Sequence, residues 1–170
     1  MEVHQVYTWL FEHDNCFLGP TVRRFVAEMR KASKNGNQKI TWSLVDCIPG
    51  LCDEYGVARE MAQARVECAC VVYDLGDLRR ASDLLNQAAG YYRPLVYHRG
   101  VTFCLLGIVY SEMRGGEEKA LVAWRDSRRI LKNYHQYNRF LPHDQIDSCK
   151  RKRELIREAI CDVIESLNGE

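Results

Sequence analysis

The 170-residue sequence lacks a long apolar run, a strong net charge and the features of a secretory leader. Charged residues interrupt every apolar stretch well before the length that a bilayer crossing requires. The formal net charge is only +1, so no overall field attracts nucleic acid or an acidic membrane surface. The start of the chain, MEVHQVYTWLFEHD, has neither a basic region nor a long apolar core. These absences predict a cytoplasmic protein that does not enter membranes.

Recognisable motifs for catalysis and metal binding are also missing. The chain has no glycine-rich nucleophile turn, no phosphate loop and no HExxH. Cys16 can be drawn as a nucleophile with His13 and Asp14 beside it, but nothing in the pattern orients the three. His13, Cys16, Cys47 and Cys52 offer four zinc ligands without the CxxC spacing of zinc modules. We therefore expect no enzyme activity, no metal ligands and no cofactor.

Eight cysteines are present, yet their spacing does not suggest a disulfide framework. They lie inside apolar helical patterns rather than in loops. Cys68 and Cys70 are two positions apart, so they point to different sides of a helix and do not share a ligand or a disulfide. The cysteines are expected to be reduced, small, buried hydrophobic residues.

What the sequence does contain is helical periodicity, with apolar residues recurring about every 3.6 positions. The run YDLGDLRRASDLLNQA, residues 73–88, joins two such stretches through Gly76 and Asp77, and Asp77 suits the N-cap of the second. A similar turn at Gly115 follows, and superposing Ala81 on Ala120 gives a shift of 39 residues. A helical hairpin repeated at this period indicates a helical solenoid.

The repeated pattern resembles the tetratricopeptide repeat (TPR) family over roughly residues 60–132. The match consists of small residues at helix crossings with large apolar residues between them: Ala69, Gly76, Asp77, Ala81, Leu85 and Ala88 in one repeat, and Gly107, Tyr110, Ala120, Trp124 and Ser127 in the next. The position often occupied by tryptophan is Arg65 in the first repeat and Phe103 in the second. The resemblance implies an all-α fold of antiparallel helical hairpins stacked as a short right-handed superhelix, with about seven or eight helices in total.

We expect one all-helical domain over residues 1–170. Its N-terminal helices occupy residues 1–57, where 20–33 and 41–55 can form a degenerate repeat. TPR-like repeats follow at 58–93 and 95–140. The last helix, at 143–168, has one apolar stripe and one charged face, as the terminal cap of a solenoid requires.

The resemblance also implies a ligand on the concave face, which the first helix of each repeat lines. The residues carried over to that face are Val66, Cys70, Tyr73, Cys104, Ile108 and Ser111. They are largely apolar, which favours an amphipathic helix or an extended segment of a partner protein. The lysine and asparagine clamp that the family uses for a C-terminal carboxylate is missing there. The alternative, equally favoured, is that these residues pack against the N-terminal helices.

A second candidate surface is a basic patch formed by Arg125, Arg128, Arg129 and Lys132, with a further basic cluster at 150–153. Interspersed acidic residues and the lack of an aromatic platform favour a solvated helix face, so nucleic acid is not the favoured partner.

The leading functional prediction is a non-enzymatic adaptor, scaffold or regulatory subunit that binds another protein. The alternative is a sensor or a transcriptional or defence-type regulator that binds a peptide, nucleic acid or metal. A short solenoid has apolar ends, so assembly into a homo-oligomer is also considered.

Overall fold

The computed structural model describes residues 2–4, 6–7, 17–55 and 57–132, and the fold in this part of the chain is all-α. Six helices are found there and no strand: α2 (Pro20–Lys34), α3 (Gln38–Tyr55), α4 (Ala58–Asp74), α5 (Leu78–Tyr91), α6 (Val96–Glu112) and α7 (Glu117–Lys132). Residues 3–4 and 6–7 are also helical. The prediction of an all-α chain is confirmed for these residues. The expected capping helix at 143–168 lies outside the described residues, so the total of seven or eight stays a prediction.

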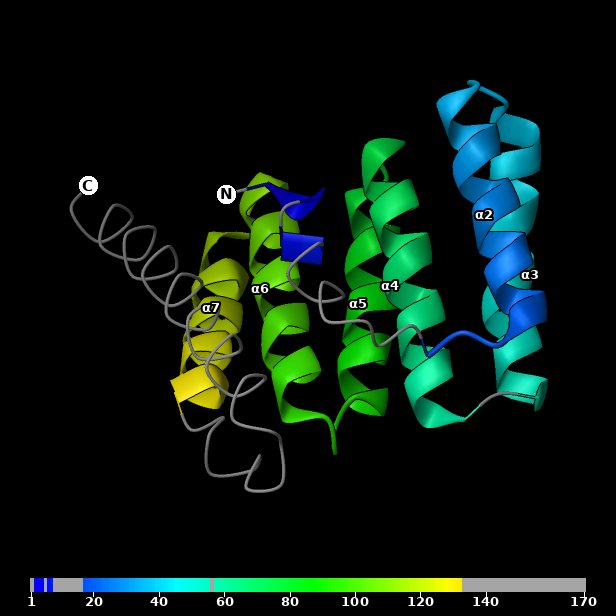
Figure 1. Cartoon of the computed structure of the whole chain (residues 1–170). Coiled ribbons are helices and arrows are strands. Elements are labelled where there is room, and N and C mark those ends of the chain that lie inside the picture. The colour runs from blue at the N-terminus through cyan, green and yellow to red at the C-terminus, as the bar shows by residue number, and fades with distance from the viewer. Residues whose placement is uncertain (1, 5, 8–16, 56, 133–170) are drawn as a thin grey trace.

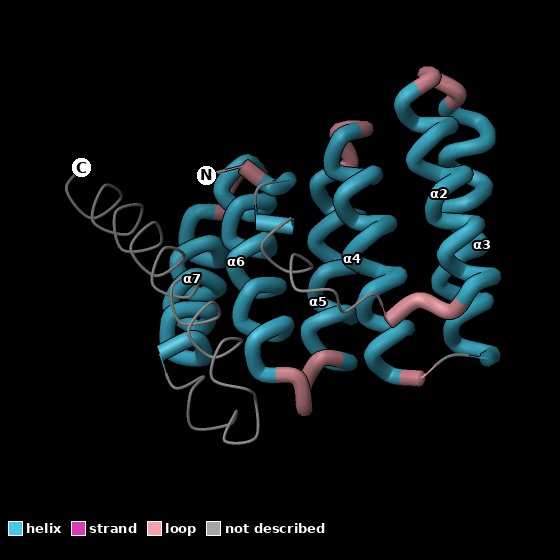
Figure 2. The backbone as a smooth tube through the Cα atoms, in the orientation of Figure 1, coloured by secondary structure: helices cyan, strands magenta, loops and turns pink. Residues whose placement is uncertain are grey.

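The helices pack as three antiparallel pairs in chain order, α2 with α3, α4 with α5 and α6 with α7. Figures 1 and 2 show the three pairs standing side by side in one row. Contacts between α3 and α4 and between α5 and α6 join neighbouring pairs. The pair α4 and α5 is therefore in the middle of the row and is covered from both sides.

The turns of the first two pairs have the same backbone structure. Gly36 and Gly76 have φ of +70° and +87°, a region that glycine adopts without steric cost. The amide after each glycine donates to a carbonyl five residues back, from Asn37 to Ala32 and from Asp77 to Val72. This is the Schellman arrangement that ends many helices. The first pair thus turns in the same way as the second, although its sequence does not show the repeat pattern.

Helix α4 is buried along most of its length because it contacts both neighbouring pairs. Every residue from 62 to 72 is buried, including the polar side chains of Gln63, Arg65 and Glu67. A helix that is buried all round must find a partner for each polar group that it carries. None of the helices in the described ranges is long and apolar enough to cross a bilayer.

Candidate partner-binding face

The residues predicted to line the concave face lie on α4 and α6. We call this set the α4–α6 face: Val66, Cys70 and Tyr73 of α4 with Cys104, Ile108 and Ser111 of α6. Tyr73 is half-buried and Ser111 is exposed, whereas the other four are buried. The four buried side chains belong to the same core cluster as Val3 and Val6. Cys70 also lines a cavity together with His4 and Tyr7, so residues from the start of the chain lie beside this part of the face.

Before α2 the structure describes residues 2–4, 6–7 and 17–19, which we call the N-terminal segment. Figure 1 shows its first residues, in dark blue, beside α6. Residues 17–19 continue past the beginning of α4 to Pro20, where α2 begins. Contacts of His4 with Asp74 and of Tyr7 with Glu67 place N-terminal residues beside α4.

Hydrogen bonds hold the N-terminal segment along α4. In each of four pairs, the partner on α4 is a carboxylate or a carboxamide: His4 with Asp74, Tyr7 with Glu67, Phe17 with Gln63, and Gly19 with Glu60. Later residues of the segment thus meet earlier residues of α4, so the segment runs antiparallel to the helix. We call Glu60, Gln63, Glu67 and Asp74 the acceptor row.

Two of these contacts are made by the backbone of the segment. The amide of Phe17 donates to Oε1 of Gln63 at 2.5 Å, and the amide of Gly19 donates to Oε2 of Glu60 at 2.8 Å. Backbone amides are present in every polypeptide except at proline. Part of the acceptor row therefore recognises an extended chain whatever its side chains are.

Glu67 is a deeply buried member of the acceptor row, with a side chain only 4% exposed. Its carboxylate accepts hydrogen bonds from the Tyr7 hydroxyl and from the Arg30 guanidinium on α2. Burial raises the pKa of the Glu67 carboxyl, and the nearby Arg30 charge opposes that rise. The Arg30 guanidinium also lies 5.4 Å from the centroid of the Tyr7 ring. These three residues tie the N-terminal segment, α2 and α4 together.

A small cavity of about 240 Å³ lies beside this network, between α2, α4 and the N-terminal segment. Basic side chains of α2, Arg30 and Lys34, line one side of it, and the acidic Glu67 and Asp74 line the other. The cavity is therefore bordered by charges of both signs. One residue of the α4–α6 face, Cys70, is part of its lining.

The N-terminal segment also contacts an aromatic cluster around His98 of α6. The His98 ring lies 5.1 Å from the ring of Phe17, 5.2 Å from that of Tyr92 and 5.7 Å from that of Tyr97, between ring centroids. Burial lowers the pKa of His98 to about 4. The imidazole is therefore neutral at physiological pH and acts as a packing residue at the point where Phe17 docks.

The depressed pKa of His98 predicts a stability that falls in mild acid. The unfolded chain binds a proton at its ordinary pKa of 6.5, whereas the folded chain resists protonation until about pH 4. Stability from neutral His98 is thus full above pH 6.5 and is lost as the pH falls toward 4, by up to about 3 kcal/mol. Urea unfolding of the wild type and of His98→Gln across this range measures the difference. The variant should show the flatter profile, and parallel profiles would show that His98 titrates normally.

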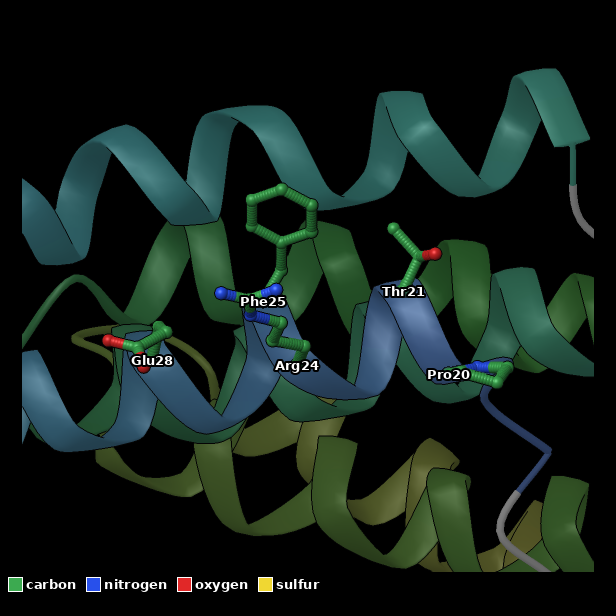
Figure 3. A pocket seen from close by; sticks show the side chains of 5 residues that line it. All are labelled: Pro20, Thr21, Arg24, Phe25 and Glu28. Atoms are coloured by element: carbon green, nitrogen blue, oxygen red, sulfur yellow. The ribbon is translucent and has the colours of Figure 1, made fainter.

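Two larger cavities lie elsewhere on the molecule. One of about 660 Å³ runs along α2, and Figure 3 shows Phe25 and Thr21 extending from that helix toward α3. The other, about 420 Å³, lies over α5, α6 and α7 and includes Phe103 and the exposed Val122. Among the described residues lining these cavities, no polar side chain is buried, so nothing in them fixes the orientation of a ligand.

The predicted basic patch is an exposed surface of α7. Arg125, Arg128, Arg129 and Lys132 all have exposed side chains, and Arg129 donates to Asp126 at 3.0 Å. The second basic cluster, at 150–153, lies outside the described residues. The structure therefore adds no contact that sets this patch apart from ordinary solvated helix surface.

The cysteines and histidines of the described ranges do not gather into a metal site. No group of three or more histidine, cysteine, aspartate or glutamate side chains with suitable geometry is found in these ranges. Burial raises the pKa of the Cys52 thiol to about 11 and that of the Cys104 thiol to about 12. Such thiols are protonated at neutral pH and are poor nucleophiles. His13 and Cys16 lie outside the described residues.

Comparison with protein-family models, with curated proteins and with solved structures found no match to this chain.

Proposed function

We propose that this chain is a non-enzymatic protein-interaction module with a TPR-like right-handed superhelix, which acts in the cytoplasm as an adaptor, scaffold or regulatory subunit. Its partner is another protein, of which one segment binds along the α4–α6 face. The observation that supports this most strongly is the pair of hydrogen bonds from the amides of Phe17 and Gly19 to side chains of α4. A helix that satisfies backbone amides of a segment laid along it has the means to bind a polypeptide.

The burial of α4 supports the same proposal. Carboxylates and carboxamides are costly to bury unless a donor is supplied. Gln63 and Glu67 are nevertheless buried at the centre of the chain, and donors for them come from the N-terminal segment and from α2. A helix whose only task was to fill a core would carry apolar residues at these positions.

Site-specific photo-crosslinking tests the proposed function. A photoreactive amino acid is placed at Ser111, which is exposed on the α4–α6 face, and at the exposed Val122 of α7 as the matched control. After irradiation in lysate of the source cells, the Ser111 position should give a discrete crosslink to one other protein, and the Val122 position should not. Identical crosslinking patterns from both positions would contradict the proposal.

A further inference from the structure

We propose that the N-terminal segment is a built-in occupant of the α4–α6 face, and that the partner displaces it with a segment of the same chemistry. That chemistry is two aliphatic side chains three positions apart, each followed by a hydrogen-bond donor and not by an acidic residue. This inference rests on the proposed function and specifies the kind of segment that the face accepts.

The aliphatic anchors are Val3 and Val6. They are three positions apart in a helical stretch, so they lie on the same side of it. Val3 is 3% exposed and Val6 is fully buried, and both join the core cluster that contains Val66, Cys104 and Ile108. A partner segment that replaced them must supply apolar side chains of similar size at the same spacing.

The donors follow the anchors directly in the sequence. His4 lies with Nε2 2.9 Å from Oδ1 of Asp74, and the Tyr7 hydroxyl donates to Glu67. Because the acceptor row carries three carboxylates, an acidic side chain at either donor position would face like charge. Tyrosine, histidine, lysine or arginine satisfies these acceptors, so we infer a neutral or basic partner segment.

The N-terminal segment can be exchanged for a partner segment, because its outer contact lies at the surface. Its outer contact, between His4 and Asp74, joins side chains that are 60% and 44% exposed. A segment held by a tether has a high effective concentration, so it reduces the apparent affinity of any competitor without preventing its binding. The free chain is therefore expected to bind its partner weakly until the segment leaves.

A peptide competition experiment on the full-length chain tests this inference. The probe is a fluorescent synthetic peptide of residues 1–19 with Cys16→Ser, and binding is followed by fluorescence anisotropy. The proteins are the wild type and the double variant Val3→Asp/Val6→Asp, whose own segment no longer fits the apolar face. We expect the double variant to bind the peptide at least about tenfold more tightly than the wild type. The same peptide carrying both aspartates is the matched control and should bind neither protein.

The chemistry of the donors is tested with a second peptide. In the peptide with Tyr7→Glu, a carboxylate faces Glu67, and its affinity for the double variant should fall by about tenfold or more. Equal affinity for the two peptides would overturn the inference that the face selects donors.

The remaining outcomes separate the inference from the proposed function. If wild type and double variant bind the peptide equally well, the face is open in the free chain, which overturns the built-in occupant and leaves the proposed function standing. If neither protein binds the peptide although circular dichroism shows that both are folded, the face does not take segments and both proposals fail.

If the double variant loses its helicity, the full-length variant Tyr7→Phe replaces it, because this change removes only the hydroxyl that reaches Glu67. A gain of about threefold in peptide binding is then expected, and no gain would overturn the inference.

Discussion

Replacing Gly107 with alanine should lower the free energy of unfolding by about 3 kcal/mol, the upper end of the range for overpacking a core. A β-carbon at position 107 of α6 would lie 2.1 Å from Nε1 and 2.3 Å from Cδ1 of the Trp124 indole on α7. Trp124 is only 3% exposed, so its indole is enclosed by the protein. The two helices must therefore separate or the indole must leave its rotamer, and both cost packing.

Gly90→Ala is the matched control for Gly107→Ala. Gly90 is also helical, near the end of α5, but no heavy atom lies within 4 Å of a β-carbon built there. This variant should be neutral or more stable by up to about 1 kcal/mol, because alanine favours the helix over glycine. Urea denaturation of the two variants and the wild type provides the comparison. Equal stability of the two variants would show that the α6–α7 crossing is looser than the structure indicates.

Replacing Arg65 with alanine should have the second large effect, a loss of about 3 kcal/mol. The Arg65 side chain is 5% exposed and joins three helices. One of its terminal nitrogens donates to both carboxylate oxygens of Asp53 at 2.8 Å, and Nε donates to Gln87 at 2.9 Å. The guanidinium also lies 4.8 Å from the centroid of the Tyr91 ring. Alanine removes all of these contacts and leaves a void between α3, α4 and α5.

Arg129→Ala is the matched control, because it removes an arginine that is exposed instead of buried. Arg129 pairs with Asp126 at 3.0 Å, but its side chain is 74% exposed. Its removal should change the free energy of unfolding by about 0.5 kcal/mol or less, because solvent screens an exposed pair. Thermal or urea unfolding distinguishes the two arginines. A cost for Arg65→Ala as small as that for Arg129→Ala would mean that Arg65 is not a structural link.

The hairpins were predictable because their signals are local. Gly76 marks the turn, and Asp77 caps α5 as expected, with its carboxylate accepting from the amide of Arg80 at 3.0 Å. The small residue Gly107 lies directly against Trp124, and both were among the repeat positions that the family resemblance implies. Turn geometry, capping and close approach each depend on residues near one another in the sequence, so periodicity is enough to find them.

The covering of the α4–α6 face was left open by the sequence. Val3 and Val6 are recognisably apolar, but periodicity does not say which of the other helices they meet. The contact between Tyr7 and Glu67 spans sixty positions of the chain and leaves no local trace. The acceptor row did leave a signal, because Glu60, Gln63 and Glu67 recur at intervals of three and four on α4. A polar stripe beside the predicted apolar residues indicates a helix with a partner on that side.

Amide hydrogen exchange at Phe17 and Gly19, followed by NMR, tests most directly whether α4 binds an extended segment. In the wild type both amides should be protected, because each donates to a side chain of α4. Gln63→Ala should remove protection at Phe17 alone, and Glu60→Ala should remove it at Gly19 alone. Exchange of both amides in the wild type at the rate of an unstructured peptide would contradict the proposed role of the α4–α6 face.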